Sequence, residues 1–173
     1  MKSFKKIVAA LFGFSLLVML ASCSGYNFYR DFKNKGADID SDHSFVVLTI
    51  DDVKAKKGTE EFSLIIGNSN KDECVTAIEK MQDEFNTINF EGTVNYFSVK
   101  GMTLSERQEA TKALGTDIDS SDGIIFVAYK KDGSFKFKTS KSTDLDAKKF
   151  RVDGSGSLAY RAIADYIAET YTK

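Results

Sequence analysis

The chain has 173 residues, is 42% hydrophobic and 28% charged, and carries a formal net charge of −1 at pH 7, which is typical of one folded domain with short additional segments. Its single histidine, His43, excludes metal sites built from histidine clusters, and the absence of proline excludes any site that depends on a cis-proline. No glycine-rich phosphate-binding loop occurs in the sequence, and we expect no cofactor.

Residues 1–22 have the pattern of an export signal. Lys2, Lys5 and Lys6 precede a predominantly apolar run over residues 7–20, which is short for a membrane span. The sequence Leu20-Ala21-Ser22-Cys23 then resembles the bacterial lipobox. This resemblance implies cleavage before Cys23, diacylglycerol on its sulfur followed by N-acylation, and a protein anchored to the cell membrane outside the cytoplasm. The alternative is an ordinary secretory signal followed by an unrelated cysteine.

Removal of this signal makes the protein acidic. It takes away three lysines and leaves 21 basic residues against 25 acidic ones, a net charge of −4. That balance argues against a nucleic-acid partner. Because lipid would occupy Cys23, Cys74 would be the single free thiol, and no internal disulfide is expected.

We interpret residues 23–43 as a tether. An aromatic cluster at its start would rest either on the bilayer interface or on the domain. The acids at 38, 40 and 42 resemble the start of a calcium loop, but the glycine and glutamate that such a loop needs further on are missing. A solvated linker is therefore expected here, with the folded domain over residues 44–173.

The first half of the domain is predicted to alternate strands and helices. Residues 45–50 favour a strand, followed by a short helix that Asp51 and Asp52 cap and that stops near Gly58. Residues 62–66 favour a buried strand, and a polar turn over 68–71 leads into a helix. One face of that helix is apolar, with spacings of three and four residues between Cys74, Ala77, Ile78, Met81 and Phe85.

The second half continues this alternation and then closes with a hairpin. Residues 93–99 favour a strand, and the capping-box pattern of Thr103 and Glu106 begins a helix that Gly115 ends. Residues 123–129 and 134–138 favour strands joined by an Asp-Gly turn, and residues 157–171 favour a last helix. This order predicts an α/β three-layer sandwich with a mixed central sheet.

The same order resembles the thioredoxin-like fold, in particular the bacteriocin transport accessory proteins. FSLIIG (62–67) is similar to the strand that precedes the C-x-x-C motif of that group, with Cys74 at the second cysteine and Lys71 at the first. SERQEATKALG (105–115) and GIIFVAYKKDG (123–133) are similar to its later helix and hairpin. The resemblance covers residues 44–138.

The chain departs from that group at the reactive positions. Lys71 replaces the attacking thiol, and no cis-proline is available. Because dithiol exchange needs an activated thiolate and a resolving partner, we expect a redox-inactive domain with a binding or accessory role toward a protein partner. Cys74 is interpreted as a buried core residue. The alternatives are a monothiol oxidoreductase that uses Cys74, or a disulfide or acyl group on that sulfur.

A second resemblance concerns the fold. Residues 96–129 are also similar to TPM domains, which are linked to divalent metals and phosphate chemistry or to membrane complexes. That alternative, a TPM-like α/β fold, would make Asp117, Asp119 and Asp122 candidate calcium ligands. We interpret these acids instead as a solvated loop, and we expect no metal site.

Overall fold

The computed structural model describes residues 27–118, 124–139 and 160–171, in which five strands form one mixed sheet of order β1-β3-β2-β4-β5. The strands are β1 (Phe45–Val47), β2 (Phe62–Gly67), β3 (Val94–Ser98), β4 (Ile124–Tyr129) and β5 (Phe135–Thr139). β1 and β2 run parallel to β3, whereas β4 is antiparallel to β2 and β5 is antiparallel to β4. β2 is therefore the central strand.

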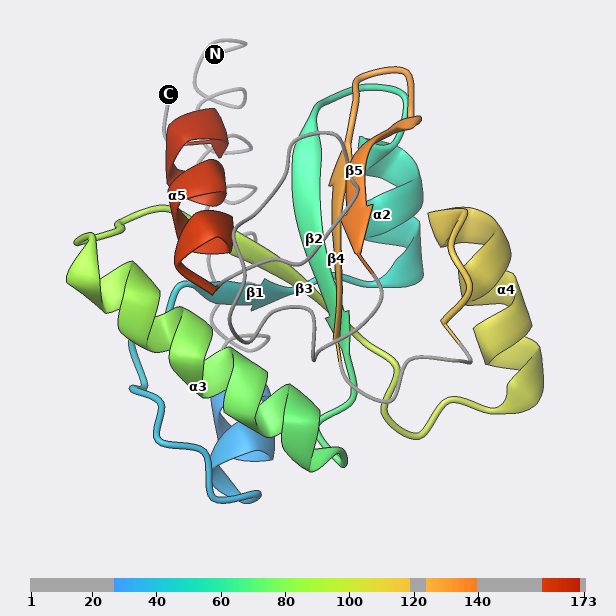
Figure 1. The fold of residues 1–173 in the computed structure, drawn as a ribbon. Helices are drawn as coiled ribbons and strands as arrows, with labels where there is room; N and C mark the ends of the chain where they lie inside the picture. The colour runs from blue at the N-terminus through green and yellow to red at the C-terminus, as the bar shows by residue number, and fades with distance from the viewer. Residues whose placement is uncertain (1–26, 119–123, 140–159, 172–173) are drawn as a thin grey trace, which may run out of the picture.

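Helices cover both faces of this sheet (Figure 1). They are α2 (Ile50–Lys56), α3 (Asp72–Thr87), α4 (Leu104–Leu114) and α5 (Tyr160–Tyr171), and residues 27–33 are also helical. α3 and α5 pack on one face, and α2 and α4 pack on the other. The molecule is the predicted three-layer α/β sandwich with a mixed sheet, and it is compatible with a thioredoxin-like fold.

Two capping boxes fix where helices begin. At α4 the predicted box is present: the Glu106 N–H donates to Thr103 Oγ1 at 3.3 Å, and the Thr103 N–H donates to Glu106 Oε2 at 2.7 Å. At α2 the cap is Thr49, with Asp52 as its box partner, whereas the sequence predicted that the two aspartates would cap. Because Thr49 begins a helix, the strand predicted over residues 45–50 ends at Val47.

The central strands are buried on both sides, which explains their unbroken apolar sequence. All six residues of β2 and of β4 are buried. Alternate side chains enter opposite cores: Ile65 packs with α3 and α5, whereas Leu64 and Ile66 pack with α2 and α4.

The structure differs from the predicted tether over the part of it that is described. Phe28 and Phe32 are only 2% and 1% exposed, and Ile39 within the acidic run is 3% exposed. The Asp38 N–H donates to Glu79 on α3, which attaches this segment to the domain. The spacing of four residues between the two phenylalanines places both on one helical face, toward the core. Residues 27–39 therefore belong to the domain. The predicted signal at residues 1–22 and the predicted lipid attachment site, Cys23, lie outside the described residues.

Candidate functional site

The two positions that resemble the redox motif lie where β2 passes into α3. Lys71 is the N-cap of α3, with extended backbone, an exposed side chain and no side-chain capping bond. Cys74 lies in the first turn of α3, and its N–H donates to the Lys71 carbonyl oxygen at 3.0 Å. The structure thus places both residues at the junction between the central strand and the following helix.

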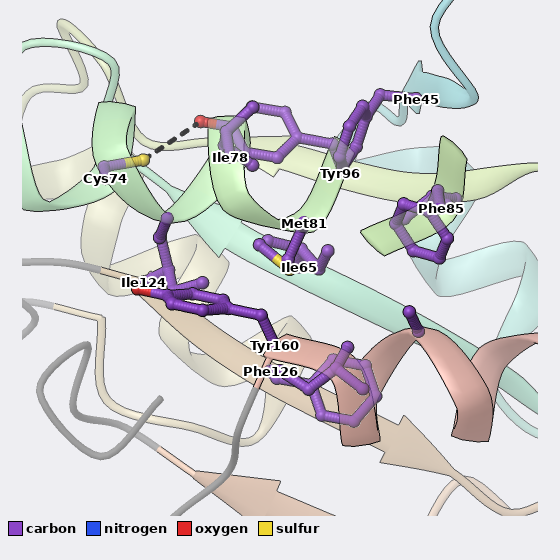
Figure 2. Close-up of a cluster of buried hydrophobic side chains, with 14 of the residues drawn as sticks. Phe45, Ile65, Cys74, Ile78, Met81, Phe85, Tyr96, Ile124, Phe126 and Tyr160 are labelled. Atoms are coloured by element: carbon purple, nitrogen blue, oxygen red, sulfur yellow. Dashed lines mark hydrogen bonds between the residues drawn. The ribbon is translucent and has the colours of Figure 1, made fainter. Parts of the chain in front are cut away.

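Cys74 is completely enclosed, as the core interpretation predicted. Its side chain is 0% exposed, and its Sγ lies 4.0 Å from the Tyr96 hydroxyl of β3, a contact in which either group can donate (Figure 2). Gly67 at the end of β2 makes room for this contact. A Cβ at position 67 would lie 2.6 Å from the Cys74 sulfur and 3.1 Å from the Tyr96 hydroxyl oxygen. The sulfur therefore fills a space that only glycine leaves open.

The enclosure makes the thiol a weak acid. Burial raises the pKa of Cys74 to about 12, although hydrogen bonding with Tyr96 and with the Asn68 backbone lowers it, and the charge of Glu73 also raises it. The start of a helix would favour a thiolate, but here desolvation outweighs that effect. At neutral pH Cys74 is protonated, and a protonated thiol is a poor nucleophile.

Tyr96 and the helix at 27–33 form the cover over this thiol. Phe28 packs edge-on against the Tyr96 ring at a centroid distance of 4.9 Å, and Phe32 does so at 5.7 Å. Burial raises the pKa of Tyr96 well above its ordinary value, and the neighbouring Cys74 adds to that increase. The phenol is therefore also neutral, so the contact joins two uncharged groups.

An ion pair joins the helix at 27–33 to the segment that follows β3. Lys100 Nζ, after β3, lies 2.9 Å from Asp31 Oδ1 on the helix at 27–33, and both side chains are partly exposed. Beside it is a cavity of about 80 Å³, which the two serines Ser69 and Ser98 help to line. Ser69 Oγ is buried and has no hydrogen-bond partner among the described residues. A cavity of this volume has room for only a few water molecules.

A larger cavity lies on the other face of the sheet, between α2, α4 and the carboxyl ends of β1 and β3. Its volume is about 360 Å³, and its lining is Val47, Leu48, Thr49, Ile50, Phe97, Ser98, Met102, Glu106, Glu109 and Ala110. Both carboxylates already have structural partners, because Glu106 closes the capping box and Glu109 lies 3.0 Å from Lys54. No thiol or imidazole lines it within the described part of the chain.

The candidate calcium ligands are described only in part. Asp117 is exposed just after α4, whereas Asp119 and Asp122 lie outside the described residues. Within residues 27–118, 124–139 and 160–171 no group of three potential metal ligands occurs. The calcium hypothesis stays a prediction. In the same part of the chain, no helix is both long and apolar enough to span a bilayer.

Comparison of the chain with protein-family models, with curated proteins and with solved structures found no match. What the site can do chemically is therefore inferred from its own residues alone. Lys71, at the N-cap of α3, carries an amine, and the thiol of Cys74 is protonated and enclosed. Sequence reasoning left open whether the aromatic cluster rests on the bilayer or on the domain, and the spacing of Phe28 and Phe32 was a visible signal for the domain.

Proposed function

We propose that this protein is a lipoprotein anchored to the cell membrane outside the cytoplasm, whose thioredoxin-like domain is redox-inactive and serves as a binding or accessory module for a protein partner. The observation that carries the proposal is Cys74, with 0% exposure beneath Tyr96 and no second cysteine at position 71. A domain that has this fold but cannot carry out disulfide exchange can still bind a partner through its surface.

The loss of chemistry follows from the requirements of disulfide exchange. A thiolate must attack, and a second thiol must resolve the mixed disulfide. The amine of Lys71 cannot take part in that sequence, and the raised pKa of Cys74 leaves almost no thiolate at neutral pH. The same two facts weigh against the alternative of a monothiol oxidoreductase that uses Cys74.

An insulin-reduction assay with dithiothreitol tests the redox part of the proposal. The protein is compared with its Cys74→Ser variant. Serine removes the thiol and has a side chain of similar volume, so the fold should be kept. We expect both proteins to leave the rate at that of dithiothreitol alone. Catalysis by the unchanged protein above the Cys74→Ser rate would show that the domain is an oxidoreductase.

Mass spectrometry of the mature N-terminus tests the anchor. We expect a peptide that begins at Cys23 and carries the mass of a diacylglyceryl thioether, with or without an N-acyl chain. The Cys23→Ser variant, which has no sulfur at this position to carry the lipid, should lose this mass. An unmodified Cys23 in the membrane fraction would contradict the anchor.

A further inference from the structure

Three segments lie together at one end of the sheet: the start of the described chain and two connections that follow strands. β1, β2 and β3 run in the same direction, so their carboxyl ends meet there. The loop at 68–71 follows β2, and the turn at 99–103 follows β3, where the Val99 N–H donates to the Gly67 carbonyl oxygen. Asn27 lies at the same end, because it lines the small cavity with Ser69 and Ser98. We call this end, with Asn27, residues 68–71 and residues 99–104, the carboxyl-end face.

The hairpin between β4 and β5 lies at the opposite end of the sheet. β4 is antiparallel to β2, with Gly67 opposite Ile124 and Phe62 opposite Tyr129, so the hairpin at 130–134 lies beside the start of β2 (Figure 1). A strand of six residues such as β2 is about 20 Å long. The hairpin and the carboxyl-end face are separated by about this length.

The chain between the proposed lipid and the carboxyl-end face is very short. Only residues 24–26 stand between Cys23 and Asn27, so the two Cα atoms lie at most about 14 Å apart. A domain of this size has a radius of gyration of about 15 Å. The helix at 27–33 provides no additional length, because Phe28 and Phe32 are buried in the core and Asp31 pairs with Lys100. The domain therefore cannot turn its far end toward the lipid.

An exposed apolar side chain lies on the same face. Leu104 is 66% exposed, the most exposed large hydrophobic side chain in the described part of the chain. It is the first residue of α4, directly after the turn at 99–103, and the neighbouring Met102 is half-buried. An exposed leucine next to a membrane anchor gains free energy by entering the interface of the bilayer.

We propose that, in the lipid-anchored protein, the carboxyl-end face rests on the bilayer, with Leu104 at the lipid interface and the hairpin between β4 and β5 pointing away. This inference rests on the proposed acylation of Cys23. It turns the Cys74 corner toward the membrane and leaves the hairpin end and the outer surfaces of the helices to a protein partner. The occupant of the carboxyl-end face is thus lipid.

Fluorescence quenching from the membrane tests this orientation. The acylated protein is placed in vesicles of phosphatidylcholine and phosphatidylglycerol that contain a nitroxide-headgroup lipid. A fluorophore is attached through Ser105→Cys beside Leu104, or through Lys131→Cys at the hairpin; both positions are exposed. The parent protein, whose Cys74 is buried, serves as the labelling blank. We expect quenching at position 105 to exceed that at 131 by at least about twofold, since β2 separates them by about 20 Å.

A long-linker variant is the matched control. Twenty glycine and serine residues inserted between Gly25 and Tyr26 give a linker of about 25 Å root-mean-square length, which lets the domain turn. We expect the ratio between the two positions to fall by at least about half in this variant. An unchanged ratio would overturn the role given to the short tether.

The outcomes separate this inference from the function on which it rests. Mass spectrometry of the same sample shows whether Cys23 is acylated. Equal quenching at positions 105 and 131 in acylated protein overturns the orientation and leaves the lipoprotein intact. A sample without acyl chains overturns the anchor and, with it, the orientation.

Discussion

At the scale of single residues, Gly67, Cys74 and Tyr96 close the junction between β2 and α3. The apolar helical face of the sequence predicted that Cys74 would be buried, and the structure confirms it. The roles of Gly67 and Tyr96 could not be predicted, because their contacts come from neighbouring strands and depend on register. Local sequence therefore predicted the burial of the thiol, but it did not predict which residues would cover the thiol.

Replacing Gly67 with alanine should destabilise the protein by about 1–3 kcal/mol, the usual cost of overpacking. The new Cβ would stand 2.6 Å from the Cys74 sulfur. Urea unfolding measures the loss. In the Cys74→Ala background the sulfur is gone, so the same substitution should cost at least about 1 kcal/mol less. Equal costs in both backgrounds would show that the sulfur does not limit this position.

The Cys74 thiol should make stability depend on pH in the alkaline range. Burial raises the pKa of the folded-state thiol to about 12, above its ordinary value of 9.0. The stabilisation is therefore fully present below pH 9 and is lost as pH rises toward 12. Between pH 9 and pH 10 the unfolding free energy should fall by about 1 kcal/mol more in the unchanged protein than in Cys74→Ala. Parallel pH profiles of the two proteins would contradict the raised pKa.

At the scale of elements, periodicity and capping predicted most of what the structure contains. The buried strand β2, the amphipathic α3 and the capping box of α4 appear where residue pattern alone placed them. Two elements differ. Thr49 begins α2 because its hydroxyl accepts the Asp52 N–H, which shortens β1. The helix at 27–33 lies in a segment for which the sequence predicts a linker, because acidic and polar residues follow its aromatics and local composition does not show which surface those aromatics cover.

Phe28→Ala distinguishes a structural helix at 27–33 from a tether. Phe28 stacks on Phe45 at a centroid distance of 4.8 Å and is 2% exposed. Its loss should destabilise the protein by about 3–5 kcal/mol in urea unfolding, as expected for a buried phenylalanine. Asn34→Ala, at an exposed position nearby, should change stability by less than about 0.5 kcal/mol. A small effect at Phe28 would contradict the packing of this helix.

At the scale of the whole molecule, the order of elements was sufficient to predict the three layers, because short connections between parallel strands place helices on both faces. The order did not reveal which end of the sheet would be closed. That closure depends on the segment at 27–39 folding back onto α3, a contact across many residues that leaves no local signal. The proposed function rests on the same closure, since the closure separates the Cys74 thiol from solvent.

The rate at which Cys74 reacts with iodoacetamide tests this account most directly. The acylated protein is used, because its Cys23 sulfur carries lipid and contributes no thiol. Its labelling rate is compared between native buffer and denaturant. We expect the native rate to be lower by roughly 10³-fold or more, because the raised pKa alone removes about that fraction of thiolate and labelling also requires the structure to open. A native rate within about tenfold of the unfolded rate would show an accessible, reactive Cys74 and would contradict a redox-inactive domain.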